Sequence, residues 1–138
     1  MLKKIGYVII PIRKYSPYAG HNVLLKTFHL LALITFLVRY LIILAFGHRD
    51  AVVHISGFSG SHVVPLQFVL LKIAKWFKYY VIYELRGGYV IGNYENASKR
   101  YQKLFIRSLN DADYVFYQGL ENIHYFSSLS KQKKLLLS

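Results

Sequence analysis

The sequence predicts an α/β fold with a parallel, doubly wound sheet, and three observations favour it. Segments rich in β-branched and aromatic residues alternate along the chain with longer helical segments, which is the spacing of βαβ units. Glycine or serine stands just after three of the expected strands, where loops at a sheet edge approach ligands. The 138 residues, 54% of them hydrophobic and 17% charged, are enough for one domain with its own core and exclude disorder.

The first expected strand is Lys3–Ile10, which is closed by Pro11. A loop leads from it to a helix over Val23–Phe46, and Gly47 follows in the position where glycine commonly ends a helix. The second strand, Ala51–Ile55, is a short run of β-branched residues around one histidine.

A glycine-serine loop, Ser56–Ser61, follows the second strand. The next helix is expected over Pro65–Phe77, because proline is favoured in the first turn. The third strand, Tyr79–Glu84, leads into a loop over residues 86–96. A helix with alternating basic and apolar positions is expected over Ala97–Asn110.

The last expected strand, Tyr114–Tyr117, leads into a short helix near Glu121–Leu129. The tail, Ser130–Ser138, ends in three leucines and can begin a fifth strand, so the chain is expected to stop in mid-fold. No repeat, linker or low-complexity tract divides the sequence, so residues 1–138 are expected to form one domain.

The segment at residues 24–46 leaves two alternatives open. Thirteen of the twenty residues from Thr27 to Phe46 are Leu, Ile, Phe or Val, and on hydropathy they outweigh the cost of Arg39 in a membrane span. Against a span, the segment lies between two expected strands of one parallel sheet, which must be on the same side of a bilayer. We therefore expect a buried or membrane-lying helix in a cytoplasmic protein peripheral to the inner face of the membrane. A single span is the alternative. A secretory signal pattern is absent from the start.

The charge of +12, from 18 Lys and Arg against 6 Asp and Glu, predicts anionic partners. Basic residues recur at helical spacing beside apolar ones, which favours an anionic membrane surface over nucleic acid, whose binders interleave basic and stacking aromatic residues. The residues of these two basic stripes are Lys72, Lys75, Lys78, Arg100, Lys103 and Arg107. The absence of cysteine excludes disulfides and thiolate metal sites. The histidine spacing predicts no metal site.

The strand end Glu84-Leu85-Arg86-Gly87-Gly88 is the most informative segment for function. It brings fixed charge and bare backbone to the carboxyl edge of the sheet, where ligands bind in open α/β folds. Gly87 and Gly88 are expected to permit positive φ and close approach of a ligand, although a plain turn explains them too. Glu84 and Arg86 can instead form only a structural ion pair.

Five segments, in order along the chain, resemble the N-terminal domain of family-4-like glycosyltransferases of the GT-B fold. Val52–Gly57 resembles their "VVHIHG" strand, and Tyr83–Gly88 resembles their "H-x-H/R-G-G" strand end. Asn110–Val115 is similar to their "ADxV" strand entry, and Gln118–Asn122 to the turn after that strand. Pro17–Gly20 is similar to their "P-x-G-G" loop, where one of the two glycines is an alanine here.

This resemblance implies a Rossmann-like three-layer domain that is one half of a GT-B fold. In such enzymes the N-terminal half mostly holds the acceptor, and the C-terminal half, whose motifs this sequence lacks, binds the nucleotide-sugar. The expected function is the acceptor-binding half of an enzyme that transfers a sugar from a nucleotide-sugar to a glycan or lipid-linked acceptor in cell-surface polysaccharide synthesis. No cofactor is expected besides that donor substrate, and the chain alone is expected to be inactive. Many members have a histidine near Arg86, and its absence here puts a direct base role in doubt.

The resemblance also implies roles for individual residues. Arg86 would stabilise a diphosphate leaving group through bidentate hydrogen bonds, and Glu84 would orient an acceptor hydroxyl or act as a base. Two further groups would bind substrate: Gly20, His21 and Asn22 through backbone amides at a helix start, and Ser56, Gly57 and Ser59 as a pocket lining. Simpler explanations are an N-cap at Asn22 and a common Ser/Gly loop. His54 is expected to be a hydrogen-bonded core residue.

Other functions stay open. A non-catalytic membrane-docking subunit, or a truncated fragment, could recruit a separate donor-binding chain with the same residues. A small single-span membrane protein and a basic nucleic-acid binder are the remaining alternatives. The sequence does not identify the sugar, the acceptor or the stereochemistry of transfer.

Overall fold

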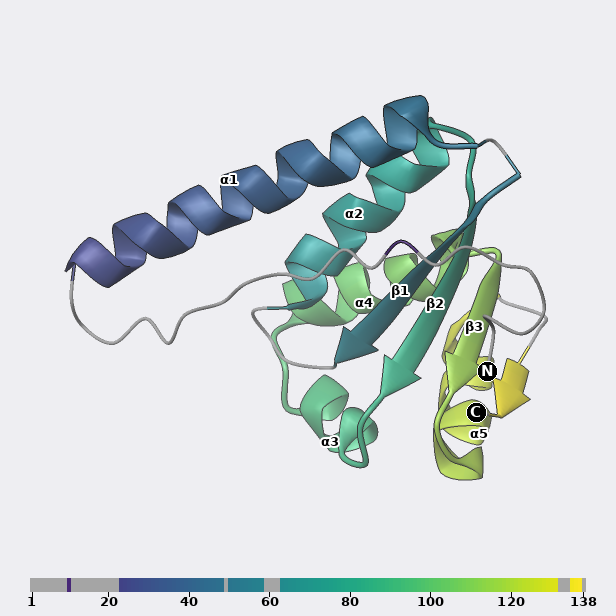
Figure 1. Cartoon of the computed structure of the whole chain (residues 1–138). Helices are drawn as coiled ribbons and strands as arrows, with labels where there is room; N and C mark the ends of the chain where they lie inside the picture. The colour runs from purple at the N-terminus through teal and green to yellow at the C-terminus, as the bar shows by residue number, and fades with distance from the viewer. Residues whose placement is uncertain (1–9, 11–22, 49, 59–62, 132–134, 138) are drawn as a thin grey trace. The chain divides into compact units, whose positions relative to one another are not determined.

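The computed structural model describes residues 10, 23–48, 50–58, 63–131 and 135–137 (Figure 1). The chain divides into two compact units, Met1–Gly47 and His48–Ser138. The predicted strand Lys3–Ile10 lies outside the described residues except for Ile10, which is not in a strand. The fold can therefore be described for one helix in the first unit and for an α/β domain in the second.

The described part of the first unit is helix α1, Val23–Phe46, with the same bounds as predicted. By length and composition, Lys26–Phe46 is apolar enough to cross a membrane. A helix of 24 residues is about 36 Å long, against about 30 Å of bilayer hydrocarbon. The Thr35 hydroxyl donates a hydrogen bond of 2.9 Å to the Leu31 carbonyl, so the helix satisfies this polar group internally. A core helix or a signal sequence passes the same test, so the choice between a span and another location stays a prediction.

The second unit contains a four-stranded parallel sheet in the order β1-β2-β3-β4. Its strands are β1 Val52–Phe58, β2 Tyr80–Arg86, β3 Tyr114–Tyr117 and β4 Leu135–Leu137. The predicted α/β class and parallel sheet are confirmed, and β4 begins where a fifth strand was expected. The arrangement is compatible with a Rossmann-like domain.

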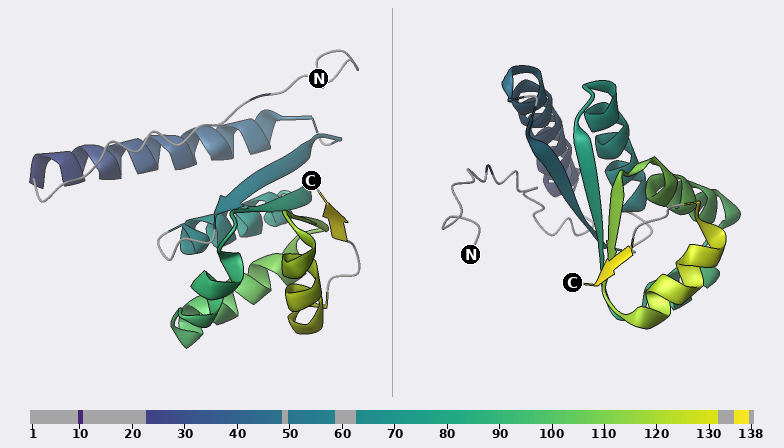
Figure 2. Two further views of the ribbon diagram at one scale, coloured as in Figure 1. Left: turned by 90° about the horizontal axis from the view of Figure 1, so that it is seen from below. Right: turned by 90° about the vertical axis from the view of Figure 1, so that its right-hand side faces the viewer.

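Helices follow the strands in alternation: α2 Val64–Trp76, α3 Val90–Glu95, α4 Lys99–Asp111 and α5 Leu120–Leu129. Figure 2 shows these four helices together on one face of the sheet. This is expected for right-handed crossovers between strands that are neighbours in sequence order. Among the described residues of this unit, no helix covers the opposite face, which we call the open face. The sequence predicted a doubly wound sheet, with helices on both faces. Within the described part of His48–Ser138, helices cover only one face.

Strand alternation divides the sheet residues between the two faces. Val81, Tyr83 and Leu85 of β2 are fully buried toward the helices, as are Val115 and Tyr117 of β3. A group of rings in mutual contact fills the space between α3, α4, α5 and β3. This aromatic cluster consists of Tyr94, Tyr101, Phe105, Tyr117, Tyr125 and Phe126. It is the part of the core that holds the last two helices against the sheet.

Two predicted loops are partly regular structure. Ser56, Gly57 and Phe58 were expected in a loop, but they continue β1, because each pairs with a residue of β2 in parallel register. Arg86 is the last residue of β2 rather than a loop residue. The predicted loop at residues 86–96 contains the short helix α3, whose last carbonyls accept hydrogen bonds from the Asn96 and Gln102 side chains.

Two aspartates hold helix α2 by ion pairs: Asp113, just before β3, and Asp111, the last residue of α4. Both oxygens of Asp113 lie 2.8 Å from Lys75 Nζ, and Oδ2 accepts a 2.7 Å hydrogen bond from the Val81 amide. Lys72 Nζ lies 2.7 Å from Asp111 Oδ2. The predicted basic stripe on this helix is therefore neutralised at two of its three positions, and the third, Lys78, lies beyond the helix end at φ 63°.

Candidate functional site

The candidate site lies on the open face, near the carboxyl ends of β1 and β2. Parallel register pairs Ser56 with Glu84, and Phe58 with Arg86. Because side chains alternate along a strand, Glu84 and Arg86 share one face, and His54 contacts Glu84 there. The sheet thus brings together three polar side chains from two strands.

Glu84 is the centre of this group, which we call the Glu84 cluster. Its side chain is 9% exposed, and its two oxygens have different neighbours. Oε1 lies 3.0 Å from Arg86 Nε, and Oε2 lies 3.1 Å from His54 Nε2. The latter contact lacks hydrogen-bond geometry, so Oε2 is a buried acceptor without a hydrogen-bond partner among the described residues. Burying a carboxylate oxygen without a hydrogen-bond partner costs free energy of folding. Such unsatisfied polar atoms often mark functional sites.

The two partners of Glu84 reach solvent. The Arg86 side chain is 53% exposed and the His54 side chain 48% exposed. The hydrogen bond to Glu84, and then its charge, raise the pKa of Arg86 above its ordinary value, so the guanidinium stays charged. The Arg86 contact with Glu84 uses Nε, which leaves the Nη groups to bind an anion or a sugar hydroxyl.

The predicted ion pair of Glu84 and Arg86 is therefore confirmed as an interaction, and its catalytic role stays a prediction. The expectation for His54 as a core residue is wrong, because its half-exposed ring points to the open face, where it also meets Phe116 edge-on at 6.4 Å between ring centroids. Sequence reasoning missed His54 as a member of the site. Strand alternation combined with the register of β1 on β2 would have placed it beside Glu84.

At the carboxyl edge, a hydrogen bond links the loop after β2 to the loop after β3. Gly87 has φ 124°, which confirms the predicted positive φ, and its amide donates a 3.2 Å hydrogen bond to Gln118 Oε1. Gly88 does not have positive φ, so of these two glycines only Gly87 uses this conformational freedom. The Asn122 side-chain amide donates to the Gln118 carbonyl at 2.6 Å, next to Gly119 at φ 93°. Gln118 therefore fixes this corner, a role that was not predicted for it, although the Gln118–Asn122 turn was recognised.

Close packing explains why residue 57 is a glycine, without any role in a ligand pocket. It is buried in β1, and a Cβ there would lie 2.8 Å from Tyr83 Oη and 3.2 Å from Gln67 Oε1. Tyr83 Oη donates a buried hydrogen bond to Gln67 Oε1, so moving either atom away would cost that hydrogen bond. Ser56, by contrast, is exposed beside Glu84.

Replacing Gly57 with alanine is expected to destabilise the fold by about 1–3 kcal/mol, because the new methyl group overpacks the Tyr83–Gln67 contact. Chemical denaturation followed by circular dichroism measures the change. Gly88→Ala is the matched control: nothing lies within 4 Å of its Cβ position, so its effect should stay within about 0.5 kcal/mol. Equal losses in the two variants would contradict the packing explanation.

The remaining predicted residues, Gly20, His21, Asn22 and Ser59, lie outside the described residues, and their approach to Arg86 stays a prediction. Within the described part of the chain, no group of three or more His, Asp or Glu side chains is placed to hold a metal ion.

The fold and the site together define an α/β domain with a parallel sheet and a polar cluster at the carboxyl ends of its strands. Comparisons with protein-family models, with curated proteins and with solved structures find no match for this chain. The residues of the Glu84 cluster therefore carry the functional argument.

Proposed function

We propose that this chain is the acceptor-binding half of a glycosyltransferase of GT-B type, which transfers a sugar from a nucleotide-sugar to a glycan or lipid-linked acceptor. The observation that carries the proposal is the Glu84 cluster. A buried carboxylate binds a guanidinium and lies against an imidazole near the carboxyl ends of a parallel sheet, which is the edge where α/β domains bind ligands. The motif resemblance around Glu84 and Arg86 supplies the substrate class.

Each side chain has a chemical role in this proposal. Arg86 binds a hydroxyl or a diphosphate oxygen through its Nη groups. His54 accepts or donates a proton at its exposed edge. Glu84 is a positioning residue, because its carboxylate binds the Arg86 guanidinium and lies 3.1 Å from His54, while its Oε2 is buried. The donor nucleotide would be bound by a second domain or chain.

Replacing Arg86 with glutamine is expected to weaken acceptor binding by about tenfold or more, the effect of losing a charge-assisted hydrogen bond. The measurement is saturation-transfer difference NMR of the full chain in lipid nanodiscs, with a panel of neutral disaccharides as probes. Arg107→Gln is the matched control, because it removes the same charge from an exposed position on α4 and should leave binding unchanged. Glu84→Gln keeps the shape of the side chain and should weaken binding without lowering thermal stability.

Residues 1–138 alone should transfer no sugar from radiolabelled nucleotide-sugars to a membrane lipid extract, since the proposal assigns them only the acceptor side of the reaction. Transfer should appear when a donor-binding chain is added, and Arg86→Gln should reduce it. Transfer by the purified chain without a partner would contradict the assignment to an acceptor half. Disaccharide binding that is equal in the wild type and Arg86→Gln would contradict the assigned site.

A second function, a non-catalytic subunit that anchors a donor-binding chain at the membrane, is favoured by the apolar helix α1. The two functions differ in what they require of the Glu84 cluster. An anchor should recruit its partner and support full activity with Arg86→Gln, but lose recruitment when polar residues interrupt α1. An acceptor half should recruit the partner with Arg86→Gln and lose activity.

A further inference from the structure

The outward side of α2 carries an exposed tryptophan. Trp76 is the only tryptophan of the chain, it is 79% exposed, and its ring meets Phe77 edge-on at 5.4 Å between centroids. Val69, one helical repeat earlier on the same side, is 45% exposed. Trp is favoured where one part of a side chain is apolar and the other is wet, as at the interface of a lipid bilayer.

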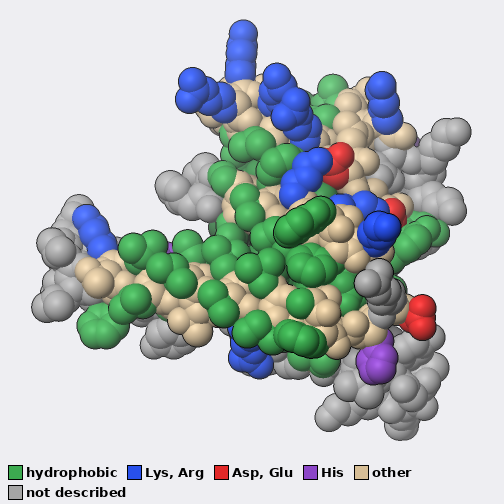
Figure 3. Space-filling view, turned by 90° about the horizontal axis from the view of Figure 1, so that it is seen from above, with side chains coloured by type: hydrophobic (Ala, Val, Ile, Leu, Met, Phe, Trp, Pro, Cys, Tyr) green, Lys and Arg blue, Asp and Glu red, His purple; other side chains and the backbone are tan. Residues whose placement is uncertain are grey.

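Helix α4 packs beside α2, and its outward side is basic. Four exposed cations recur along it: Lys99, Arg100, Lys103 and Arg107. The opposite side of α4 is apolar, with Phe105 and Leu109 fully buried. In Figure 3, Lys and Arg side chains gather in the upper part of the view, with Asp and Glu sparse among them.

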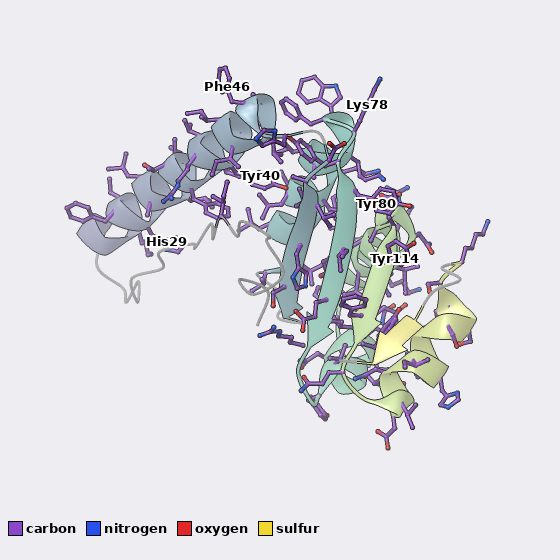
Figure 4. The ribbon with its side chains drawn as sticks, turned by 45° about the vertical axis from the view of Figure 1, so that its right-hand side comes forward. His29, Tyr40, Phe46, Lys78, Tyr80 and Tyr114 are labelled. Atoms are coloured by element: carbon purple, nitrogen blue, oxygen red, sulfur yellow. The ribbon has the colours of Figure 1, made fainter. Side chains whose placement is uncertain are left out.

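The ion pairs decide which of these cations are available to a partner. Lys72 is held by Asp111 at 2.7 Å and Lys75 by Asp113 at 2.8 Å. Lys78 and the four cations of α4 have no ion pair among the described residues. Figure 4 shows Lys78 extending outward from the chain just beyond α2. We call Trp76, Lys78 and these four cations the Trp76 surface.

We propose that the Trp76 surface docks on an anionic lipid surface, with Trp76 at the headgroup level and the cations of α4 against anionic headgroups. An exposed aromatic ring beside unpaired cations matches the composition of interfacial membrane sites. Nucleic acid fits less well, because the exposed side chains between the cations of α4 provide no aromatic ring on which bases could stack. The proposal is independent of the Glu84 cluster and of the proposed transferase function.

The single tryptophan makes the test direct, because all tryptophan fluorescence comes from Trp76. The full chain is reconstituted into phosphatidylcholine vesicles with and without phosphatidylglycerol, each also prepared with brominated acyl chains. With anionic lipid, the Trp76 emission should shift to the blue and be quenched by the brominated chains. In purely neutral vesicles, and in vesicles with anionic lipid at high salt, both effects should be much weaker.

Variants of α4 distinguish the effect of its positive charge on membrane docking from an effect on folding. Replacing Arg100, Lys103 and Arg107 together with glutamine should reduce quenching in anionic vesicles to the neutral-vesicle level. The matched control exchanges Arg and Lys at the same three positions, which keeps the charge and should keep the quenching. Circular dichroism confirms that both variants fold.

Three outcomes would overturn the proposal. The first is a blue-shifted Trp76 emission in neutral vesicles that anionic lipid does not change, because Trp76 would then be covered by protein. The second is quenching that survives the glutamine replacements. The third is an emission shift with a mixed-sequence RNA oligonucleotide, measured in detergent, and none with anionic vesicles, since the surface would then bind nucleic acid.

Discussion

Replacing Phe126 with alanine is expected to lower the free energy of unfolding of the His48–Ser138 unit by about 3–5 kcal/mol. Phe126 is fully buried and lies at the centre of the aromatic cluster. Its ring centroid is 5.0 Å from that of Tyr125, 5.2 Å from Phe105, 5.4 Å from Tyr94 and 6.1 Å from Tyr117. The truncation removes contacts of α5 with α3, α4 and β3 at once and leaves a cavity that rigid rings fill poorly. This loss is a large fraction of the about 5–15 kcal/mol by which domains are stable.

Chemical denaturation of the full chain in detergent micelles, followed by far-UV circular dichroism, measures this effect. Phe126→Leu keeps most of the apolar volume and should cost clearly less than the alanine variant. Leu129→Ala is the control on the same helix, because Leu129 is 44% exposed and its loss should cost well under about 1 kcal/mol. Similar losses for Phe126→Ala and Leu129→Ala would show that the cluster does not stabilise the fold as a unit.

The aromatic cluster is also connected to the candidate site through a series of contacts. Phe126 lies in α5, and the first turn of α5 contains Asn122, which holds Gln118. Gln118 in turn binds the Gly87 amide at the end of β2. Phe126→Ala should therefore lower both stability and ligand binding, because it loosens the corner that holds Gly87. Arg86→Gln should lower ligand binding alone.

Much of the fold follows from local patterns. The bounds of α1 and β3 agree with the prediction, because each apolar run is closed by residues that favour turns or helix ends. The failure at Ser56–Phe58 has a tertiary cause. Glycine and serine indicate a loop by composition, but Gly57 is in a strand because the Tyr83 ring occupies the space of its missing side chain. Such a contact across two strands cannot be read from either segment alone.

The candidate site, like the fold, was predictable where it depends on one segment and not where it depends on two. Glu84 and Arg86 are two positions apart on one strand, so alternation alone predicts that they share a face. Recognising His54 requires the register between β1 and β2, which only the assembled sheet provides. The substrate class came from motif resemblance, so it stays a proposal whose outcome depends on binding and transfer measurements.

Burial of tyrosine makes the stability of the second unit sensitive to alkaline pH. Tyr117 is fully buried, and its hydroxyl has no hydrogen-bond partner among the described residues that meets geometric criteria. Burial raises the pKa of Tyr117 from 10.0 to about 12, and the Ser130 hydroxyl opposes part of that rise. Below pH 10 the phenol is protonated in both the folded and the unfolded chain, so its contribution to stability is fully present. Between pH 10 and 12 the unfolded chain releases the proton first, and stability falls as the pH rises.

Replacing Tyr117 with phenylalanine should therefore flatten the decline of stability between pH 10 and 12 by up to about 2–3 kcal/mol, the equivalent of two pKa units. Near pH 7 the variant should be at least as stable as the wild type, because it removes a buried hydroxyl without a good partner. The measurement is the free energy of unfolding as a function of pH from 8 to 12. Tyr89→Phe is the control, since Tyr89 is 69% exposed and its curve should run parallel to that of the wild type. Burial raises the pKa of Tyr101 to about 12 as well and raises that of Tyr83 further, so part of the alkaline loss should persist in Tyr117→Phe. A decline in Tyr117→Phe as steep as in the wild type would show that the Tyr117 hydroxyl reaches water in the folded protein.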